Sequence, residues 1–403
     1  MKKKIYLDYA AATPIDPLVL KAMLPYFEEK HGNPSSLHKF GQEAMEAVDL
    51  ARETIAKALG VSSIGGFKEI IFTSGATEAN NLVLRGVIKS LQVFDSSRIG
   101  GGRKYLIKNP RIIISAIEHK SIFETAKDLR REGVEVVFIP VNRNGIIDLK
   151  KIKESLNNQT VLISVMYANN EIGVIEPVKK ISEIVLEFKK NKEQIYPLFH
   201  TDAVQAFQFL DCNVDKLGVD FLTLSAHKIY GPKGIGLLWA KNLKHSFLVP
   251  IITGGGQEFG FRAGTENVPL IVGFSKAVSL VVDKKRREAV RMKKLHDFFC
   301  RGIKKISGKI EILNRYKALP NIISVYFPSF SAQDMLIKLD QHGISVSSGS
   351  ACSSRSLEKS YVFSALGFEE KKILGSVRFS FGRFTTLNDL KETIRRLRKI
   401  LAD

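Results

Sequence analysis

The sequence has few cysteines and no long apolar run, and these two shortages exclude several classes of protein. Cys212, Cys300 and Cys352 are widely spaced and form neither a disulfide framework nor a zinc-binding pattern. No apolar stretch approaches the ~18 residues needed to span a bilayer, and none follows the basic start at Met1 to Lys4 as it would in an export signal. We therefore expect a globular protein of the reducing cytoplasm without a membrane partner.

Acidic residues are also scarce, with 41 of them against 61 basic residues and a net charge of +20. Such an excess can indicate nucleic-acid binding. Here the basic residues occur as scattered pairs, and the densest stretch (283–294) has the apolar spacing of a helix with one solvated face. Direct binding of nucleic acid is therefore not expected, and attraction to an acidic protein partner is the alternative.

Short apolar runs alternate with helical patterns over the first two thirds of the chain. Strands are expected at 70–72, 112–114, 134–139, 161–165, 198–200, 221–224 and 235–239. Helices are expected to end near Leu59 (before Gly60), Leu91, Arg131 and Lys190. This alternation predicts an α/β fold with a mostly parallel sheet and helices on both faces.

The pattern changes after Pro269, and at 403 residues the chain is long enough for two domains. A long helix (270–299) leads to a smaller α/β unit with strands at 321–327, 344–346 and 377–381. A final helix is capped by Thr386 and Asp389. We expect residues 16–265 to form the large domain. Residues 1–15 would join 266–403 in a small domain that carries a cysteine loop at about 345–358.

Polar side chains stand at or just beyond the ends of the expected strands: Thr77, His119, Asn169, Asp202 and Lys228. Ligands of open α/β sheets bind at the carboxyl ends of the strands, so these five should meet at one edge. Lys228 closes the strand and cluster FLTLSAHK (221–228). A lysine held dry at such a point can form a Schiff base with a carbonyl compound, although most lysines are simply solvated.

The usual nucleotide-binding motifs are missing. There is no G-x-x-x-x-G-K-[ST], and Gly231, Gly234 and Gly236 have the wrong spacing for G-x-G-x-x-G. The candidate for holding a phosphate is residues 74–77 (SGAT) at a helix start, where the helix dipole favours an anion. A purely structural turn is the alternative for this segment.

Taken together, eight segments resemble one family, the pyridoxal-phosphate-dependent cysteine desulfurases, which are related to the class V aminotransferases. They occur in the family's order: TSGATEANN (73–81), EH (118–119), NNEIG (169–173), HTDAVQ (200–205), SAHK (225–228), FRAGTEN (261–267), SSGSACSS (347–354) and RFSFGRFT (378–385). The resemblance runs from about residue 5 to residue 387. The long Ser/Gly-rich cysteine loop is similar to that of the housekeeping, iron–sulfur-assembly branch.

The resemblance implies a fold-type-I enzyme whose cofactor is pyridoxal 5′-phosphate, bound to Lys228. Asp202 would pair with the ring nitrogen, and His119 would stack on the ring and act as an acid–base group. Asn169 and Gln205 would hydrogen-bond the ring oxygen. The phosphate would be bound by Ala76, Thr77, Ser225, His227 and, from the neighbouring subunit of a homodimer, Thr265.

The same resemblance implies the reaction. Arg378, with Asn33 and Asn169, would bind the carboxylate of L-cysteine. Lys228 would move protons, and the Cys352 thiolate would take the substrate sulfur as a persulfide and release alanine. Cys352 lies in a segment of little apolar content, as a mobile sulfur carrier requires, whereas Cys212 and Cys300 are expected to be structural.

Sulfur would pass from Cys352 to an iron–sulfur scaffold protein or another acceptor in thio-cofactor or tRNA-thiolation pathways. No intrinsic metal is expected, although Cys352 could transiently ligate a nascent iron–sulfur cluster. Two alternatives stay open at this point: a lyase acting on selenocysteine or another amino acid, and a non-catalytic scaffold with the same fold.

Overall fold

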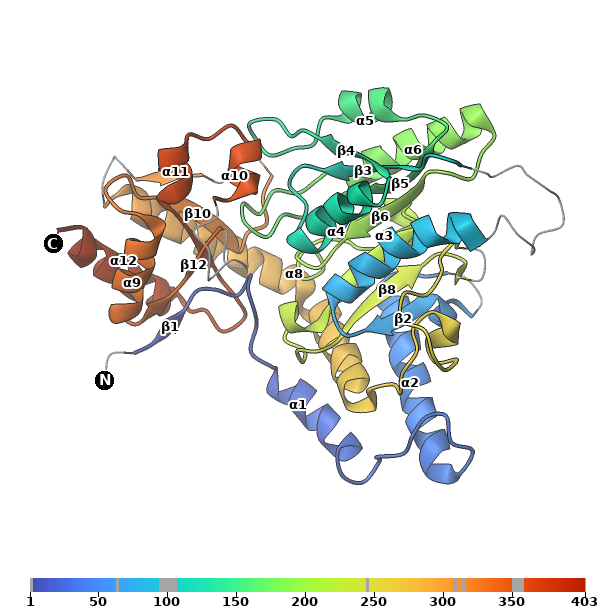
Figure 1. Cartoon of the computed structure of the whole chain (residues 1–403). Coiled ribbons are helices and arrows are strands. Elements are labelled where there is room, and N and C mark those ends of the chain that lie inside the picture. Colours follow the sequence, from blue (N-terminus) through green and yellow to red (C-terminus); the bar gives the residue numbers. More distant parts are fainter. Residues whose placement is uncertain are drawn as a thin grey trace.

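The computed structural model describes residues 3–62, 65–93, 107–243, 246–306, 310–313, 317–349 and 359–402. Cys352, residues 350–358 of the expected cysteine loop and residues 94–106 lie outside these ranges. Figure 1 shows a larger unit built around one sheet and a smaller unit that carries both chain termini, with helix α8 running between them.

The larger unit contains a seven-stranded sheet. Its strands lie in the order β2 (Ile70–Thr73), β8 (Gly236–Ala240), β7 (Phe221–Ser225), β6 (Leu198–Asp202), β5 (Thr160–Ser164), β3 (Arg111–Ser115) and β4 (Glu135–Ile139). Strand β8 is antiparallel to both of its neighbours, and the pairs from β7 to β4 are all parallel. All seven strands predicted from the sequence are present, and the mostly parallel α/β fold is confirmed.

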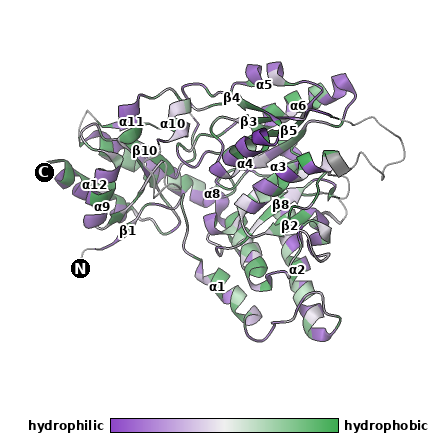
Figure 2. Ribbon diagram, viewed as in Figure 1, coloured by the Kyte–Doolittle hydropathy of each residue, from purple (hydrophilic) through white to green (hydrophobic). Residues whose placement is uncertain are grey.

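Helices cover both faces of this sheet because successive strand residues point to opposite sides. On one face, Ile113, Ile163 and Phe199 belong to a core shared with α2 (Lys39–Ala58), α6 (Val178–Lys192) and the first half of α8 (Val268–Lys304). On the other face, Ile112 and Leu162 pack with α3 (Ala76–Val93) and α4 (Lys120–Arg131). The strands are largely hydrophobic in Figure 2, whereas α4 and α5 (Leu149–Ser155) carry hydrophilic turns.

The smaller unit is built on an antiparallel sheet in the order β12 (Ser347–Ser348), β13 (Ser376–Ser380), β10 (Ile322–Tyr326) and β9 (Glu311–Ile312). The second half of α8 packs into its core together with α12 (Leu387–Ala402), and α9 (Ala332–Gln341) contributes Met335 and Leu339. The predicted cap of α12 is present, since Asp389 N–H donates to Thr386 Oγ1 over 3.2 Å. Two short helices, α10 (Tyr361–Ala365) and α11 (Glu370–Leu374), complete the unit.

The N-terminal residues connect the two units. Strand β1 (Ile5–Tyr6) pairs in parallel with β11 (Ile344–Ser345) of the smaller unit, and Asp8 forms a bridge with Ser380. The chain then enters the larger unit at α1 (Pro17–Met23), whose first turn is capped by Asp16. Residues 8–12 therefore lie where the two units meet. The short helix α7 (Val214–Leu217) lies farther along the larger unit, between β6 and β7.

Candidate active site

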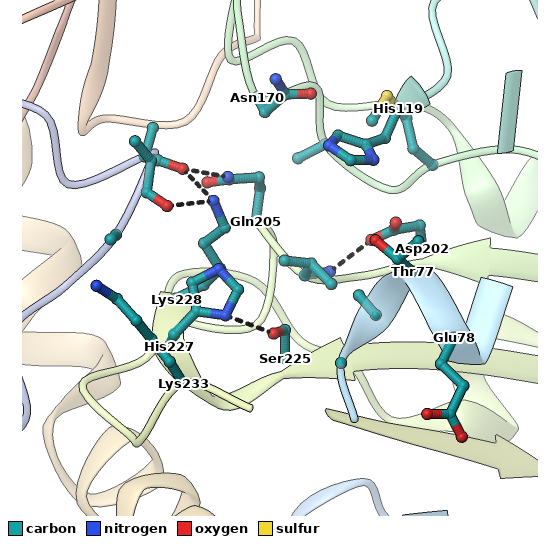
Figure 3. A pocket seen from close by; sticks show the side chains of 18 of the residues that line it. Thr77, Glu78, His119, Asn170, Asp202, Gln205, Ser225, His227, Lys228 and Lys233 are labelled. Carbon is teal, nitrogen blue, oxygen red and sulfur yellow. Dashed lines mark hydrogen bonds between the residues drawn. The ribbon is translucent and has the colours of Figure 1, made fainter. Parts of the chain in front are cut away.

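A cavity of about 570 Å³ opens at the carboxyl ends of β6 and β7 and at the start of α3, within the ~300–1,000 Å³ usual for small-molecule sites. Its wall includes most of the residues predicted to act: Ala76, Thr77, His119, Asp202, Gln205, Ser225, His227, Lys228 and Arg378. Figure 3 shows His119, Asp202, Gln205 and Lys228 around this space. The structure thus brings together side chains from five separate segments of the chain.

Lys228 follows β7 in a single helical turn, Ala226–Lys228. Its Nζ donates to the carbonyl oxygens of Ala10 (2.6 Å) and Ala11 (2.7 Å). The Gln205 amide donates to the same Ala10 oxygen over 3.0 Å. The N-terminal segment therefore aims the lysine amine, a role for backbone atoms that the sequence analysis did not predict.

Asp202 ends β6 and is almost completely buried. Its Oδ1 accepts from Val204 N–H (3.0 Å) and its Oδ2 accepts from the Asn80 amide (2.9 Å). These two hydrogen bonds fix the orientation of the Asp202 carboxylate on the cavity wall.

His119 caps the N-terminus of α4: its Nδ1 accepts from Ser121 N–H over 3.1 Å and lies 2.9 Å from Ser121 Oγ. Burial lowers the pKa of His119, and the positive charges of Lys228 and Lys120 lower it further, while Asp202 opposes these effects. The ring is therefore neutral at pH 7, with Nδ1 accepting hydrogen bonds.

An anion site is formed where the start of α3 approaches β8. A Cβ at Gly236 would lie 2.7 Å from Gly75 Cα, so only glycine allows this close approach. The N–H groups of the first helical turn have no partner within the helix and can bind an anion. His227 Nδ1 lies 2.9 Å from Ser225 Oγ on the opposite wall. Burial, Lys228 and Lys233 lower the pKa of His227 to about 4, so this ring is neutral as well.

The two asparagines of NNEIG (169–173) differ in what they can bind. Asn169 is fully buried; its amide donates to Ile117 O (2.9 Å) and its Oδ1 accepts from Glu171 N–H (2.8 Å) and Ile172 N–H (3.0 Å). It holds its own turn together and does not line the cavity. The neighbouring Asn170 does line it, and its side chain is seen there in Figure 3. The position predicted for Asn169 is thus occupied by Asn170.

Arg378 lies in β13 with only 3% of its side chain exposed. Its Nη2 donates to Asp8 Oδ1 (2.8 Å) and its Nη1 donates to Asn170 O (2.9 Å). Three of the five N–H donors of the guanidinium remain, and the one on Nε is buried without a hydrogen-bond partner among the described residues. Burial raises the pKa of Asp8, and Arg378 opposes that shift. The N–H groups of Nη1 and Nη2 that these two bonds do not use can donate to a further anion.

Two further predicted residues lie away from the cavity. Asn33 and Thr265 are exposed and do not line this cavity; the Asn33 side chain accepts from Ser35 N–H within its own loop. Cys352 is outside the described residues, but Gly349 is on the cavity wall. Within the described ranges, no group of three His, Cys, Asp or Glu residues could hold a metal ion.

The other two cysteines have environments that suppress reactivity. Burial raises the pKa of the Cys212 thiol to about 12 and that of the partly exposed Cys300 to about 11.

The helices of the described residues include none that is both long and apolar enough to cross a bilayer.

The comparisons with known proteins agree with this geometry. The family model described as aminotransferase class V matches residues 5–392. A relative named "Cysteine desulfurase IscS", from Dictyoglomus turgidum, is 43% identical over 402 residues, which cover 100% of this chain and 95% of the relative. Among solved structures, one named "NifS-like protein" is similar with a TM-score of 0.87 and 34% identity, covering 99% of this chain and 100% of that one.

A second solved structure, described as "SspA in complex with cysteine", has a TM-score of 0.78 and 33% identity. It covers 95% of this chain and 100% of that chain. The similarity therefore extends over both units and is not confined to the sheet of the larger one.

Proposed function

The chain belongs to the class V aminotransferase family and, within it, to the cysteine desulfurases, and on this premise we propose that its central cavity binds pyridoxal phosphate on Lys228 and desulfurates L-cysteine. The observation that carries the proposal is the placement of the Lys228 amine and the Asp202 carboxylate on the wall of one cavity. The Lys228 amine can bind a carbonyl carbon, and the Asp202 carboxylate can bind a protonated ring nitrogen.

The residues present fit the cofactor. The first turn of α3, with Ser225 and His227, suits a phosphate because it offers N–H and hydroxyl donors at the positive end of a helix. Asn170 and Gln205 offer amide donors for a ring oxygen. When bound, pyridoxal phosphate supplies an acceptor for the electrons released at the substrate α-carbon.

The protein's own residues then have separate tasks. Arg378 binds the substrate carboxylate through the N–H groups that Asp8 and Asn170 leave unused. Lys228 Nζ removes the proton of the substrate α-carbon and later returns it. His119, neutral and carrying its proton on Nε2, exchanges protons with the substrate on the cavity side.

Cys352 takes the sulfur. Its thiolate attacks the sulfur of bound L-cysteine, so that an S–S bond forms and the C–S bond breaks. The electron pair of that bond stays with the β-carbon, which takes up a proton and leaves in L-alanine. The atoms and electrons balance without an outside oxidant, and the transferred sulfur remains on Cys352 as a persulfide for an iron–sulfur scaffold protein or another acceptor.

We propose that the exposed Thr265 reaches the cofactor phosphate of the neighbouring subunit in a homodimer. Asn33, also exposed, is the further candidate for the substrate carboxylate. A cytoplasmic location remains a prediction, based on cysteine usage.

The test is to measure alanine and sulfide released from L-cysteine in the presence of a thiol reductant. Wild type should bind pyridoxal phosphate with a visible absorbance band and release the two products in equal amounts. Lys228→Ala should lose the band, and Cys352→Ser should lose sulfur transfer, whereas Cys300→Ser should keep both. Full activity of Cys352→Ser would refute the persulfide route and favour a lyase such as one acting on selenocysteine. A wild type that binds no cofactor would instead favour a non-catalytic scaffold.

A further inference from the structure

Behind the cavity, one asparagine side chain connects two groups of the site. The Asn80 amide, completely buried on α3, donates to Asp202 Oδ2 (2.9 Å) and to Ser121 Oγ (2.8 Å). Ser121 Oγ in turn lies 2.9 Å from His119 Nδ1. The three contacts form one chain from the carboxylate to the imidazole, through residues that were not predicted from the sequence.

Chemistry fixes the direction of these hydrogen bonds. Asp202 can only accept while it is ionised, so Asn80 must turn its NH2 group toward it. The same NH2 group then donates to Ser121 Oγ, which leaves the hydroxyl proton free to point toward His119 Nδ1. Asn80 Oδ1 is left buried without a partner among the described residues. The opposite amide orientation would place this oxygen against the carboxylate.

This direction determines the tautomer of His119. Nδ1 accepts from both the Ser121 hydroxyl and Ser121 N–H (3.1 Å), so it cannot carry a proton in the neutral ring. The proton is therefore on Nε2. The charged groups that act on this ring are Asp202, Lys228 and Lys120. Nearby, Glu118 is fully buried, and burial keeps its pKa well above the ordinary carboxyl value, so it adds no second negative charge beside Asp202.

We propose that Asn80 and Ser121 are positioning residues: Asn80 holds the Asp202 carboxylate in place toward the cofactor ring, and Ser121 holds the proton of His119 on Nε2. Neither side chain needs to touch the substrate. The inference rests on the proposed function, because it assumes that Asp202 and His119 act on bound pyridoxal phosphate. It adds that both groups are set by the same buried hydrogen-bond chain.

The first experiment measures cofactor affinity. Pyridoxal phosphate is titrated into the full-length apo protein, and binding is followed by the visible absorbance band. Asn80→Leu, which keeps the side-chain volume, and Asn80→Ala should both weaken binding by about 10- to 100-fold, the usual effect of losing a hydrogen bond to a charged group. The matched control is Asn81→Ala, since Asn81 bonds Thr77 O and Arg85 instead of Asp202.

The second experiment reads the histidine directly, without activity. In protein labelled with ¹⁵N-histidine, wild-type His119 should show a protonated Nε2 and an accepting Nδ1. Ser121→Ala removes the hydroxyl donor and leaves only the backbone N–H on Nδ1, so the Nδ1 resonance should shift toward that of a free ring and the apparent pKa of His119 should rise; Ser121→Thr, which keeps the hydroxyl, should restore the wild-type spectrum. Circular dichroism identifies any variant that fails to fold, and the remaining variants still decide the result.

The outcomes separate this inference from the function it rests on. If Asp202→Asn weakens cofactor binding but both Asn80 variants bind like wild type, the positioning role of Asn80 is refuted and the function stands. An unchanged His119 spectrum in Ser121→Ala refutes the role of Ser121. If wild type itself binds no pyridoxal phosphate, or Asp202→Asn binds it normally, the proposed function fails first.

Discussion

The buried ion pair between Arg52 and Glu258 closes the open edge of the large sheet, and breaking it should destabilise the protein strongly. Only 3% of each side chain is exposed, and Arg52 Nη2 lies 2.8 Å from Glu258 Oε1. Strand β2 is at the sheet edge, where backbone groups lack a neighbouring strand. Arg52 donates to Ile70 O of β2, and Glu258 Oε2 accepts from Phe72 N–H over 2.9 Å.

The perturbation is Glu258→Gln, which keeps the shape but removes the negative charge. Arg52 cannot lose its proton, so the variant buries an uncompensated cation at a cost of about 3–5 kcal/mol. With ~2–4 °C for each kcal/mol in a domain of this size, the Tm should fall by about 6–20 °C. The loop at Glu258 and Phe259 is held with φ of 49° and 58°, in the left-handed region, and losing its anchor would release that strain.

Replacing Arg52, the other partner of the ion pair, should change stability in a different, pH-dependent way. Burial already raises the pKa of Glu258, and Arg52 counteracts this rise. In Arg52→Met the folded-state pKa therefore moves further above the unfolded value. A carboxyl with a raised folded pKa loses stability as pH rises from the unfolded toward the folded value. Arg52→Met should thus lose stability relative to wild type as pH rises above the ordinary carboxyl pKa, whereas Glu258→Gln should show no such additional slope.

The assay is urea unfolding followed by the fluorescence of Trp239, the single tryptophan, which is buried in β8. Glu53→Gln, an exposed change on the same helix as Arg52, is the matched control and should stay within about 0.5 kcal/mol of wild type. A loss below about 1 kcal/mol in Glu258→Gln, less than breaking a buried pair requires, would refute the reasoning. So would identical pH slopes for the two variants.

Two further predictions use groups whose pKa values are shifted by burial. Burial raises the pKa of Glu176 to about 8, so wild-type stability should fall as pH rises from about 5 to 8. Glu176→Gln should therefore be about 1–3 kcal/mol more stable than wild type at pH 9 but not at pH 5. Equal urea midpoints of the two proteins at both pH values would contradict this. Burial raises the pKa of the Cys212 thiol to about 12 and that of the Cys300 thiol to about 11, so little reactive thiolate is present at pH 8. Folded Cys352→Ser protein should therefore react with iodoacetamide at pH 8 at least about 100-fold more slowly than an ordinary thiol. Rapid labelling of Cys212 or Cys300 in the folded protein would contradict the environments described above.

The elements that the sequence predicted share a local cause. Each strand of the large sheet contains a short run of largely buried apolar residues, rich in β-branched residues in β3, β4 and β5, and such runs are recognisable alone. The short helices α1, α5, α10 and α11 have five to seven residues, too few for a helical period to show. The two-residue strand β1 was not predicted, because it exists through the pairing of Ile5 with Ile344 of β11, which lies within the predicted strand at 344–346. No local pattern can reveal a pairing between residues so far apart in the chain.

Some residues of the candidate site could be predicted from local sequence patterns, and others could not. Lys228, Asp202 and His119 each directly follow or end a predicted strand, so the topology of a parallel sheet was enough to bring them together. Which asparagine of NNEIG (169–173) faces the cavity depends on the turn itself: Asn169 Oδ1 accepts two backbone N–H groups and turns inward, which leaves Asn170 facing the cavity. Asn80 was missed because a buried polar residue on a helix gives no sequence signal of its partners.

The N-terminal segment shows why a site of this kind cannot be assembled from side-chain motifs alone. Ala10 and Ala11 accept from Lys228, which follows β7 of the large sheet, and Asp8 accepts from Arg378, which belongs to β13 of the small sheet. One short stretch therefore sets the positions of the proposed cofactor lysine and the proposed substrate arginine. Because burial raises the pKa of Asp8, its carboxylate is held less firmly in the ionised state than an exposed one. A substrate carboxylate can thus share Arg378 with Asp8. The backbone of residues 8–11 contacts both Lys228 and Asp8's partner Arg378, so it sets how far the lysine amine lies from the guanidinium.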